Sequence, residues 1–241
     1  WATELVSRNR DQDRLLKSNI FNHVFVHSEA CKQKIIKNNW VPKHKISIML
    51  NGFDPEIHLN LNKRKNIDLL FVGSSLERRR KKFKELSKHF NLEVYNVFGD
   101  EMINLFNRAK IVLNIHAENS LDTETRVFEA LGCGAFLISE KLSKENPFIP
   151  NEHYIETNSL KEMIEKITFF LKNKKNRDYV ADKGYKEAIS KHTYTKRAEE
   201  FITIFKHYNH SESNQPYNRA VLAIFSVYEF LKRKFKIIQG K

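Results

Sequence analysis

The sequence is poor in the residues that cross-link or bend a chain. Among its 241 residues are two cysteines, seven glycines and five prolines. Two cysteines exclude a disulfide framework or a cysteine-rich metal cluster, and they favour a reducing, cytoplasmic compartment. The scarcity of glycine and proline predicts few long loops. All apolar runs in the sequence are shorter than the roughly 18 residues that a membrane-spanning helix needs.

Positive charge is plentiful instead. Lys and Arg total 42 against 29 Asp and Glu, which gives a formal net charge of +13. Such a chain favours anionic partners: nucleic acid, anionic lipid headgroups or the phosphates of a small ligand. The basic residues gather in four runs, at 63–65, 78–82, 172–177 and 232–236. Aromatic residues are not interleaved with these runs as base-stacking platforms would be, so no nucleic-acid partner is expected; a basic nucleic-acid binder stays an alternative.

Short apolar segments alternate with helical patterns along the chain. Strands are expected at 23–28, 45–50, 67–73, 92–99, 110–117 and 135–140. Helices are expected between them at 29–40, 78–90, 100–109 and 122–131, and afterwards at 159–173, 175–191 and 195–209. This alternation predicts an α/β fold with a parallel sheet covered by helices on both faces, followed by a helical C-terminal tail.

One short helix carries two side chains of opposite charge. It is expected to begin with Asp122 as its N-cap and to end at the Gly-Cys-Gly that follows Leu131. Glu129 falls in its last turn, where the helix dipole disfavours an anion by roughly 0.3–1 kcal/mol. Two interpretations are open: an ion pair with Arg126, three residues earlier, or a ligand-binding role for both side chains.

The ends of the predicted strands carry small and polar residues. Gly73-Ser74-Ser75 follows a buried strand and leads into a helix whose first turn holds three arginines, at 78–80. Small residues let backbone N–H groups approach a ligand, and a helix N-terminus attracts phosphate. The alternative is a solvated basic face. The strands at 110–117 and 135–140 would end at the same edge, where ligands bind in open α/β sheets.

Two further segments allow more than one interpretation. Asp-Gln-Asp at 11–13 has the carboxylate spacing that can bridge a divalent cation to a diphosphate. Its neighbours have the pattern of an exposed helix face, so no metal site is expected there. Residues 217–238 are apolar nearly all round and have a basic end. They are expected either to dock on another domain or to lie in the plane of an anionic membrane surface.

Three runs, in this order, resemble a known family: LLFVGSSLERRRKKFKEL, IVLNIH and TRVFEALGCGAFLIS. With the helical tail they resemble the C-terminal, donor-binding domain of group-1 glycosyltransferases of the GT-B fold, most closely the CgeB-like branch with its R-x-F-E motif. The likeness covers most of residues 21–208 and implies a Rossmann-like sheet. It also implies four regions: the end of an acceptor-side domain (1–58), an interdomain linker (59–66), a nucleotide-sugar-binding domain (67–209), and a linker with a basic amphipathic helix (210–241).

The resemblance implies a hexosyl-type transfer from a nucleotide sugar of the UDP or GDP type. The acceptor would be a glycan or a lipid-linked molecule of the envelope or cell surface. No cofactor and no obligatory metal are implied, because positive charge on the protein would stabilise the departing nucleoside diphosphate. The expected location is the cytoplasm, including the inner face of the cell membrane. A GT-B-like binding or assembly module without turnover is the second alternative.

The same resemblance assigns roles to particular residues. Glu129 would hold the ribose, and Arg126 would face the diphosphate together with Arg79 or Arg80. Arg126 and Glu129 are therefore the expected catalytic residues.

Four more residues complete the implied donor site. Gly73 and Ser74 would bring backbone donors close to the diphosphate, whereas His116 and Asn119 would lie near the sugar or the phosphates.

The sequence departs from the family pattern in two respects. Many group-1 enzymes have a second glutamate eight positions before Glu129, where this chain has Leu121; Asp122 and Glu124 are the candidates to replace it. An acceptor domain also needs ~100 residues or more, and 22 precede the first expected strand. We therefore expect the acceptor contacts, and any catalytic base from that half, to be either missing or supplied from elsewhere.

Overall fold

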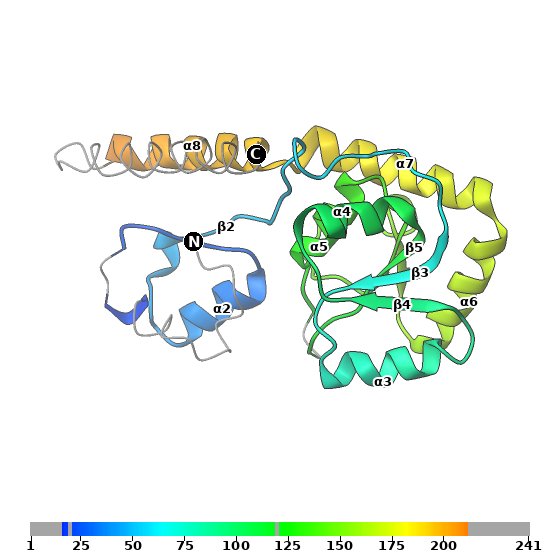
Figure 1. Ribbon diagram of the computed structural model, residues 1–241. Coiled ribbons are helices and arrows are strands. Elements are labelled where there is room, and N and C mark those ends of the chain that lie inside the picture. The colour runs from blue at the N-terminus through cyan, green and yellow to red at the C-terminus, as the bar shows by residue number, and fades with distance from the viewer. Residues whose placement is uncertain (1–15, 19–20, 119–120, 212–241) are drawn as a thin grey trace. The chain divides into compact units, whose positions relative to one another are not determined.

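The computed structural model describes residues 16–18, 21–118 and 121–211 (Figure 1). Three predicted features lie outside these residues: the Asp-Gln-Asp segment at 11–13, Asn119, and the apolar segment at 217–238.

Five parallel strands form the main sheet, in the order β4-β3-β5-β6-β7. They are β3 (Ile67–Val72), β4 (Leu92–Tyr95), β5 (Ala109–Asn114), β6 (Leu137–Glu140) and β7 (Ile155–Thr157). Leu70 of β3 pairs with Glu93 of β4 on one side and with Val112 of β5 on the other. The strand order therefore reverses at β3, as in a Rossmann-like doubly wound sheet. The predicted α/β fold with a parallel sheet is confirmed.

Helices cover both faces of this sheet (Figure 1). They are α3 (Glu77–Leu86), α4 (Gly99–Arg108), α5 (Thr125–Gly132), α6 (Leu160–Lys172) and α7 (Lys174–Lys191). Successive strand residues point to opposite faces. Leu70 and Val112 join the core formed with α4 and α5, whereas Leu69 and Ile111 join the core formed with α3 and α6. Burial on both faces explains why β3 and β5 have unbroken apolar sequences.

The start of α5 differs from the prediction. Its N-cap position is Glu124, not Asp122. Asp122 accepts a hydrogen bond from the backbone N–H of Thr123 at 2.8 Å, so its carboxylate is used in the turn before the helix. Aspartate is a preferred N-cap residue and glutamate is not, yet Glu124 occupies the cap position, where its side chain makes no capping hydrogen bond.

The other predicted elements are present with their ends moved by a few residues, and one strand was not predicted. β7 has three residues, which are too few to show a period. Ile155 is buried and pairs with Ile138 of β6. Pairing with an existing sheet, rather than local propensity, makes this segment a strand.

A small unit near the N-terminus is built around two parallel strands, β1 (Val24–Val26) and β2 (Ile46–Ile48). The helix α2 (Glu29–Lys37) and the 3-10 turn η2 (Lys43–Lys45) connect these strands. Val26, Cys31, Ile35 and Ile46 form its core. Ser28 caps α2 by accepting a hydrogen bond from the Cys31 N–H at 3.2 Å.

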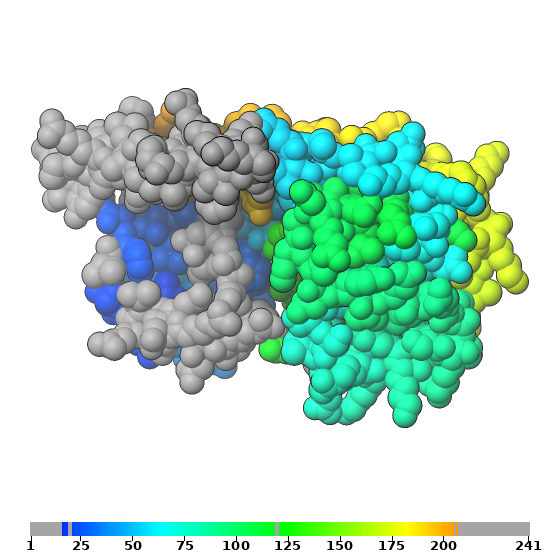
Figure 2. All heavy atoms as spheres, viewed as in Figure 1, coloured from blue at the N-terminus to red at the C-terminus, as the bar shows by residue number. Residues whose placement is uncertain are grey.

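The irregular segment 59–66 leads into β3 and is fixed by one buried amide. Asn107 of α4 accepts from the Leu61 N–H at 2.6 Å and donates to the Leu59 carbonyl at 2.9 Å. In Figures 1 and 2 this cyan segment lies along the yellow α7, and residues of both line one cavity.

The last described helix is α8 (Tyr194–Ser211). Contacts divide the chain into two compact units, Trp1–Ala198 and Glu199–Lys241, and the boundary falls within α8. Within the described ranges, no helix has the length and apolar character required to cross a membrane. The domain limits at 1–58, 59–66, 67–209 and 210–241, and membrane contact by 217–238, stay predictions.

Candidate active site at the carboxyl edge of the sheet

The carboxyl ends of β3, β5 and β6 are joined by hydrogen bonds through one buried side chain. Asn114, the last residue of β5, donates from Nδ2 to Glu124 Oε2 at 2.9 Å and to Ser139 Oγ at 3.1 Å. Its Oδ1 accepts from Arg126 Nη1 at 2.9 Å. The sheet reverses its strand order between β4, β3 and β5, and such a switch point is where α/β sheets bind ligands.

Arg126 is fixed at this switch point. Its Nε donates to the Val72 carbonyl at 2.5 Å, and its guanidinium lies 4.6 Å from the centre of the Phe71 ring. A Cβ atom on Gly73 would be 2.4 Å from Arg126 Nη2, and Gly73 has a φ of 138°. Position 73 therefore requires glycine both for its backbone geometry and for the guanidinium beside it.

Glu129 does not form an ion pair with Arg126, so the first interpretation of this pair is wrong. Among the described residues, the ion-pair partner of Glu129 is His58, with Nε2 3.6 Å from Oε1. The Glu129 side chain is 21% exposed. Burial lowers the pKa of His58, but Glu129 and the Asp54 carbonyl outweigh burial and raise it overall.

His116 forms a buried ion pair with Glu124. Its Nδ1 lies 2.9 Å from Glu124 Oε1 and its Nε2 lies 2.8 Å from the Lys141 carbonyl. A carbonyl and an ionised carboxylate only accept, so both ring nitrogens carry protons. Burial opposes each charge, yet the pairing raises the pKa of His116 and lowers that of Glu124.

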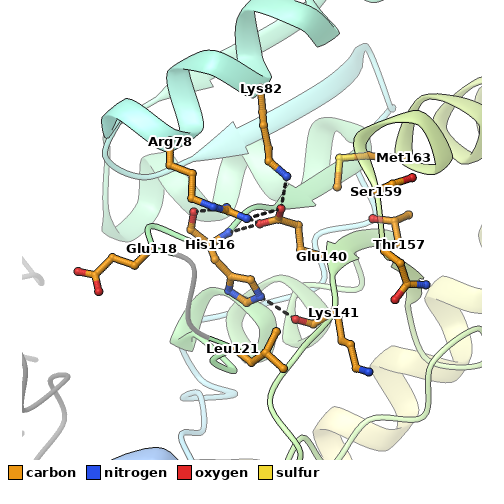
Figure 3. A pocket seen from close by; sticks show the side chains of 11 residues that line it. Arg78, Lys82, His116, Glu118, Leu121, Glu140, Lys141, Thr157, Ser159 and Met163 are labelled. Atoms are coloured by element: carbon orange, nitrogen blue, oxygen red, sulfur yellow. Dashed lines mark hydrogen bonds and ion pairs between the residues drawn. The ribbon is translucent and has the colours of Figure 1, made fainter.

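A cavity of about 280 Å³ opens beside His116 (Figure 3). The residues that line it are Arg78, Lys82, His116, Glu118, Leu121, Glu140, Lys141, Thr157, Asn158, Ser159 and Met163. Arg78 Nη1 and Nη2 donate to the two oxygens of Glu140 at 2.7 and 2.8 Å, and Lys82 also bonds to Glu140. Burial raises the pKa of Glu140, but Arg78 and Lys82 outweigh it and lower this pKa to about 2. The two cations and the carboxylate thus form one fixed cluster.

The other predicted donor residues differ in burial and in their hydrogen-bond partners. Gly73 and Ser74 lie at the end of β3, and Ser74 is exposed. Arg79 is buried and donates to the carbonyls of Ile115 and Ser74 at 2.8 and 3.0 Å. Arg80 is exposed on α3. Arg79 is therefore tied to main-chain groups, and neither of these two arginines lines the cavity.

Arg78, Lys82 and Glu140 were not among the predicted site residues, and Glu124 was predicted only as one of two candidates for the missing second glutamate. The helical periodicity of α3 could have indicated part of this site. Arg79, Phe83 and Leu86 form the buried face of the helix. Arg78 and Lys82, four residues apart, lie together on another face. Their partner Glu140 is 62 residues from Arg78 in sequence, and no local pattern identifies it.

Across the described ranges, no group of three or more His, Cys, Asp or Glu side chains is placed to hold a metal ion.

Comparison with known structures finds a similar fold in several solved proteins. HepE of Anabaena, solved in complex with UDP-glucose, matches with a TM-score of 0.61 and 12% identity over 85% of this chain and 70% of HepE. Sucrose-phosphate synthase of Thermosynechococcus elongatus matches with a TM-score of 0.60 and 13% identity over 88% and 65% of the two chains. A point mutant of S. aureus TarM, solved with UDP among its ligands, matches with a TM-score of 0.55 and 15% identity over 80% of this chain and 45% of TarM. These similarities establish a shared fold.

Sequence comparison identifies the family. No curated protein sequence matches the chain significantly. No comparison tests the narrower likeness to the CgeB-like branch, which stays a prediction. A family model described as glycosyl transferase-like matches residues 56–203, which is more than half of the chain. The chain therefore belongs to the glycosyl transferase-like family, and its Rossmann-like domain has the fold of the GT-B glycosyltransferases.

Proposed function

We propose that this chain binds the donor in a glycosyltransferase that uses a nucleoside diphosphate sugar of the UDP or GDP type. The acceptor in this proposal is a glycan or lipid-linked molecule of the envelope or cell surface. Family membership supports sugar transfer. Two of the similar structures contain UDP-glucose or UDP, which supports a nucleotide donor.

The observation that carries the proposal is that the Arg126 guanidinium has no carboxylate ion-pair partner among the described residues. Its hydrogen-bond partners among the described residues are the neutral Val72 carbonyl and the Asn114 amide. Glu124 is paired with His116, so its charge is already balanced. Burial lowers the pKa of Arg126, and nearby Glu124 and Glu129 only partly oppose this effect. A diphosphate at the sheet edge would supply the anion that this cation lacks.

The groups around Arg126 suit the same ligand. Gly73 and Ser74 precede α3, whose N-cap position makes no side-chain capping hydrogen bond. A helix N-terminus of this kind favours a phosphate. We propose that the backbone here and the Arg126 guanidinium together stabilise the departing nucleoside diphosphate, with no obligatory metal and no cofactor.

Glu129 is the proposed ribose ligand. It lies three residues after Arg126 on the same helix, so both side chains project from one face. Its ion-pair partner among the residues described by the structure is His58, at 3.6 Å, and the side chain is partly exposed. A carboxylate has about four lone-pair positions, so its oxygens can also accept bonds from the two vicinal hydroxyls of a ribose.

Thermal denaturation with a panel of nucleoside diphosphates tests this function. A ligand at a hundred times its Kd adds about 2.7 kcal/mol, which raises the Tm of a chain of this length by roughly 5–10 °C. We expect a rise with at least one diphosphate, unchanged by EDTA, and a much smaller rise in the Glu129→Gln variant. Glu165→Gln, at an exposed position of α6, is the matched control and should respond as the unmodified chain does. Failure of every diphosphate to raise Tm would contradict the proposal.

A further inference from the structure

A second and larger cavity lies at the opposite end of the strands, where β3 and β5 begin. Its volume is about 560 Å³, within the range of small-molecule sites, about 300–1,000 Å³. Segment 59–66, which precedes β3, and helix α7 form its walls, together with Lys110 at the start of β5. Because these strands are parallel, their starting ends lie a full strand length from Gly73 and Arg126.

The side chains that line this cavity are mostly cationic. Six are Lys or Arg (63, 64, 65, 110, 174 and 177) and two are Asp (178 and 182). Both aspartates have lysine partners, Lys174 for Asp178 and Lys186 for Asp182. Lys110 pairs with Asp68 at 2.6 Å, outside the lining.

Four of these cations lack a carboxylate partner within the described ranges, and one of them, Lys63, donates instead to the Asn104 side chain at 2.8 Å. Within the described ranges, no carboxylate lies in ion-pair distance of Arg64, Lys65 or Arg177.

Arg177 is buried, and its Nη1 donates to the Phe170 carbonyl at 2.8 Å near the end of α6. Its position is therefore fixed by neutral main-chain groups, and burial lowers its pKa although the nearby Asp178 and Asp68 oppose this effect.

The positive charge of Arg177 also acts on Lys65. It is half-buried, and burial together with the charge of Arg177 lowers its pKa to about 8. A cation that is both desolvated and close to another cation is unfavourable unless an anion joins them. Tyr185 and Phe136 also line the cavity, so an organic group beside the anion would find apolar contact.

We propose that this cavity is a second ligand site, which binds a phosphate monoester or diphosphate group through Arg64, Lys65 and Arg177. The site is separate from the proposed donor site and does not depend on it. The phosphate can belong to a small metabolite or to a lipid headgroup, and both sources present the same chemistry to these three cations.

Acetylation of lysines by acetic anhydride, followed residue by residue with mass spectrometry, tests this site. An unprotonated amine attacks a carbonyl of the anhydride and acetate leaves, so at pH 8 Lys65 should react faster than the exposed Lys161 of α6. Inorganic pyrophosphate should raise the pKa of Lys65 toward its usual value and slow its acetylation about tenfold or more. Lys161 reports any general effect of the anion on the reagent.

Variants separate this site from the donor site. Protection by pyrophosphate should persist in Glu129→Gln. In Arg64→Gln the half-protecting concentration should rise about tenfold, because a charge-assisted contact is lost. Lys144→Gln, an exposed charge-matched control, should leave it unchanged. Vesicles containing phosphatidic acid replace pyrophosphate in a parallel series, and protection by vesicles alone would assign a lipid headgroup. Unchanged Lys65 reactivity with both probes, in a chain that melts normally, would overturn the inference.

Discussion

Cations are paired with carboxylates to different degrees at the two ends of the main sheet's strands. At the carboxyl edge, Arg78 and Lys82 are bound to Glu140, and His116 is paired with Glu124. These fixed pairs leave Arg126 as a cation with neutral hydrogen-bond partners. At the other end of the strands, four cations line a cavity without a carboxylate partner in the described part of the chain. The net charge of +13 is therefore a poor guide to binding, because pairing decides which cations remain for a ligand.

The largest expected effect comes from breaking a pair at the carboxyl edge. His116→Gln leaves Glu124 buried without its partner, which typically costs about 3–5 kcal/mol. Urea denaturation should show a loss of this size in the free energy of unfolding. The double variant His116→Gln/Glu124→Gln should recover part of it, because no charge is then left unpaired. A loss below about 1 kcal/mol in the single variant would contradict the ion pair.

Gly73→Ala should have the next largest effect. The new Cβ would lie 2.4 Å from Arg126 Nη2 and the backbone φ of 138° disfavours a side chain, so we expect a loss of roughly 2–3 kcal/mol. The nucleotide-induced rise in Tm should also disappear, because the guanidinium is displaced. Gly99→Ala is the matched control: it also has a positive φ, of 60°, but nothing lies within 4 Å of its Cβ. Its cost should be about 1 kcal/mol, with nucleotide binding retained.

The His116 pair also predicts a pH dependence. The folded-state pKa of His116 is raised above the unfolded value of about 6.5. Its contribution to stability is therefore complete below that value and is lost as pH rises through the folded pKa. The difference in unfolding free energy between the unmodified chain and His116→Gln should shrink from pH 6 to pH 9. A difference that stays constant over this range would show that His116 is neutral when folded.

The smallest effect is expected at Arg78. Arg78→Lys keeps the charge but loses the bidentate contact with Glu140, at a cost of about 1 kcal/mol. The Glu140 pKa is lowered from 4.5 to about 2 in the fold, so its contribution is lost as pH falls between these values. This acid-side loss should be smaller in Arg78→Lys and unchanged in Arg80→Lys, whose arginine is exposed further along α3. Equal losses in the two variants would refute the bidentate contact.

Much of the fold could be predicted from the sequence. β3 and β5 are buried on both faces, so their apolar runs identify them without any tertiary information. β7 could not be predicted in this way, because it is a strand only through its pairing with β6. The start of α5 was misplaced because local preference favours Asp122 as the cap, whereas Glu124 occupies the cap position with its carboxylate bound to Asn114 and His116.

The placement of the candidate site residues could be predicted, but their contacts could not. Small and polar residues at strand ends predicted a common edge of the sheet, and the structure places Gly73, His116 and Glu140 there; that a ligand binds at this edge stays a prediction.

Three consecutive arginines, however, have three different environments: Arg78 lines the cavity, Arg79 is buried against main-chain carbonyls and Arg80 is exposed. Those environments depend on partners far away in sequence, such as Glu140 and Ile115, and therefore only the folded chain distinguishes them.

The most direct test of the central claim, that α5 binds a nucleotide through Arg126 and Glu129, is a calorimetric comparison of two ligands. The nucleoside diphosphate with the largest thermal shift is titrated alongside its 2′,3′-dideoxy analogue, into the unmodified chain and into Glu129→Gln. The analogue should bind the unmodified chain at least about tenfold more weakly, because two hydrogen bonds to a carboxylate are lost. In Glu129→Gln the two ligands should bind nearly alike. An equal penalty for the analogue in both proteins would show that Glu129 does not hold the ribose.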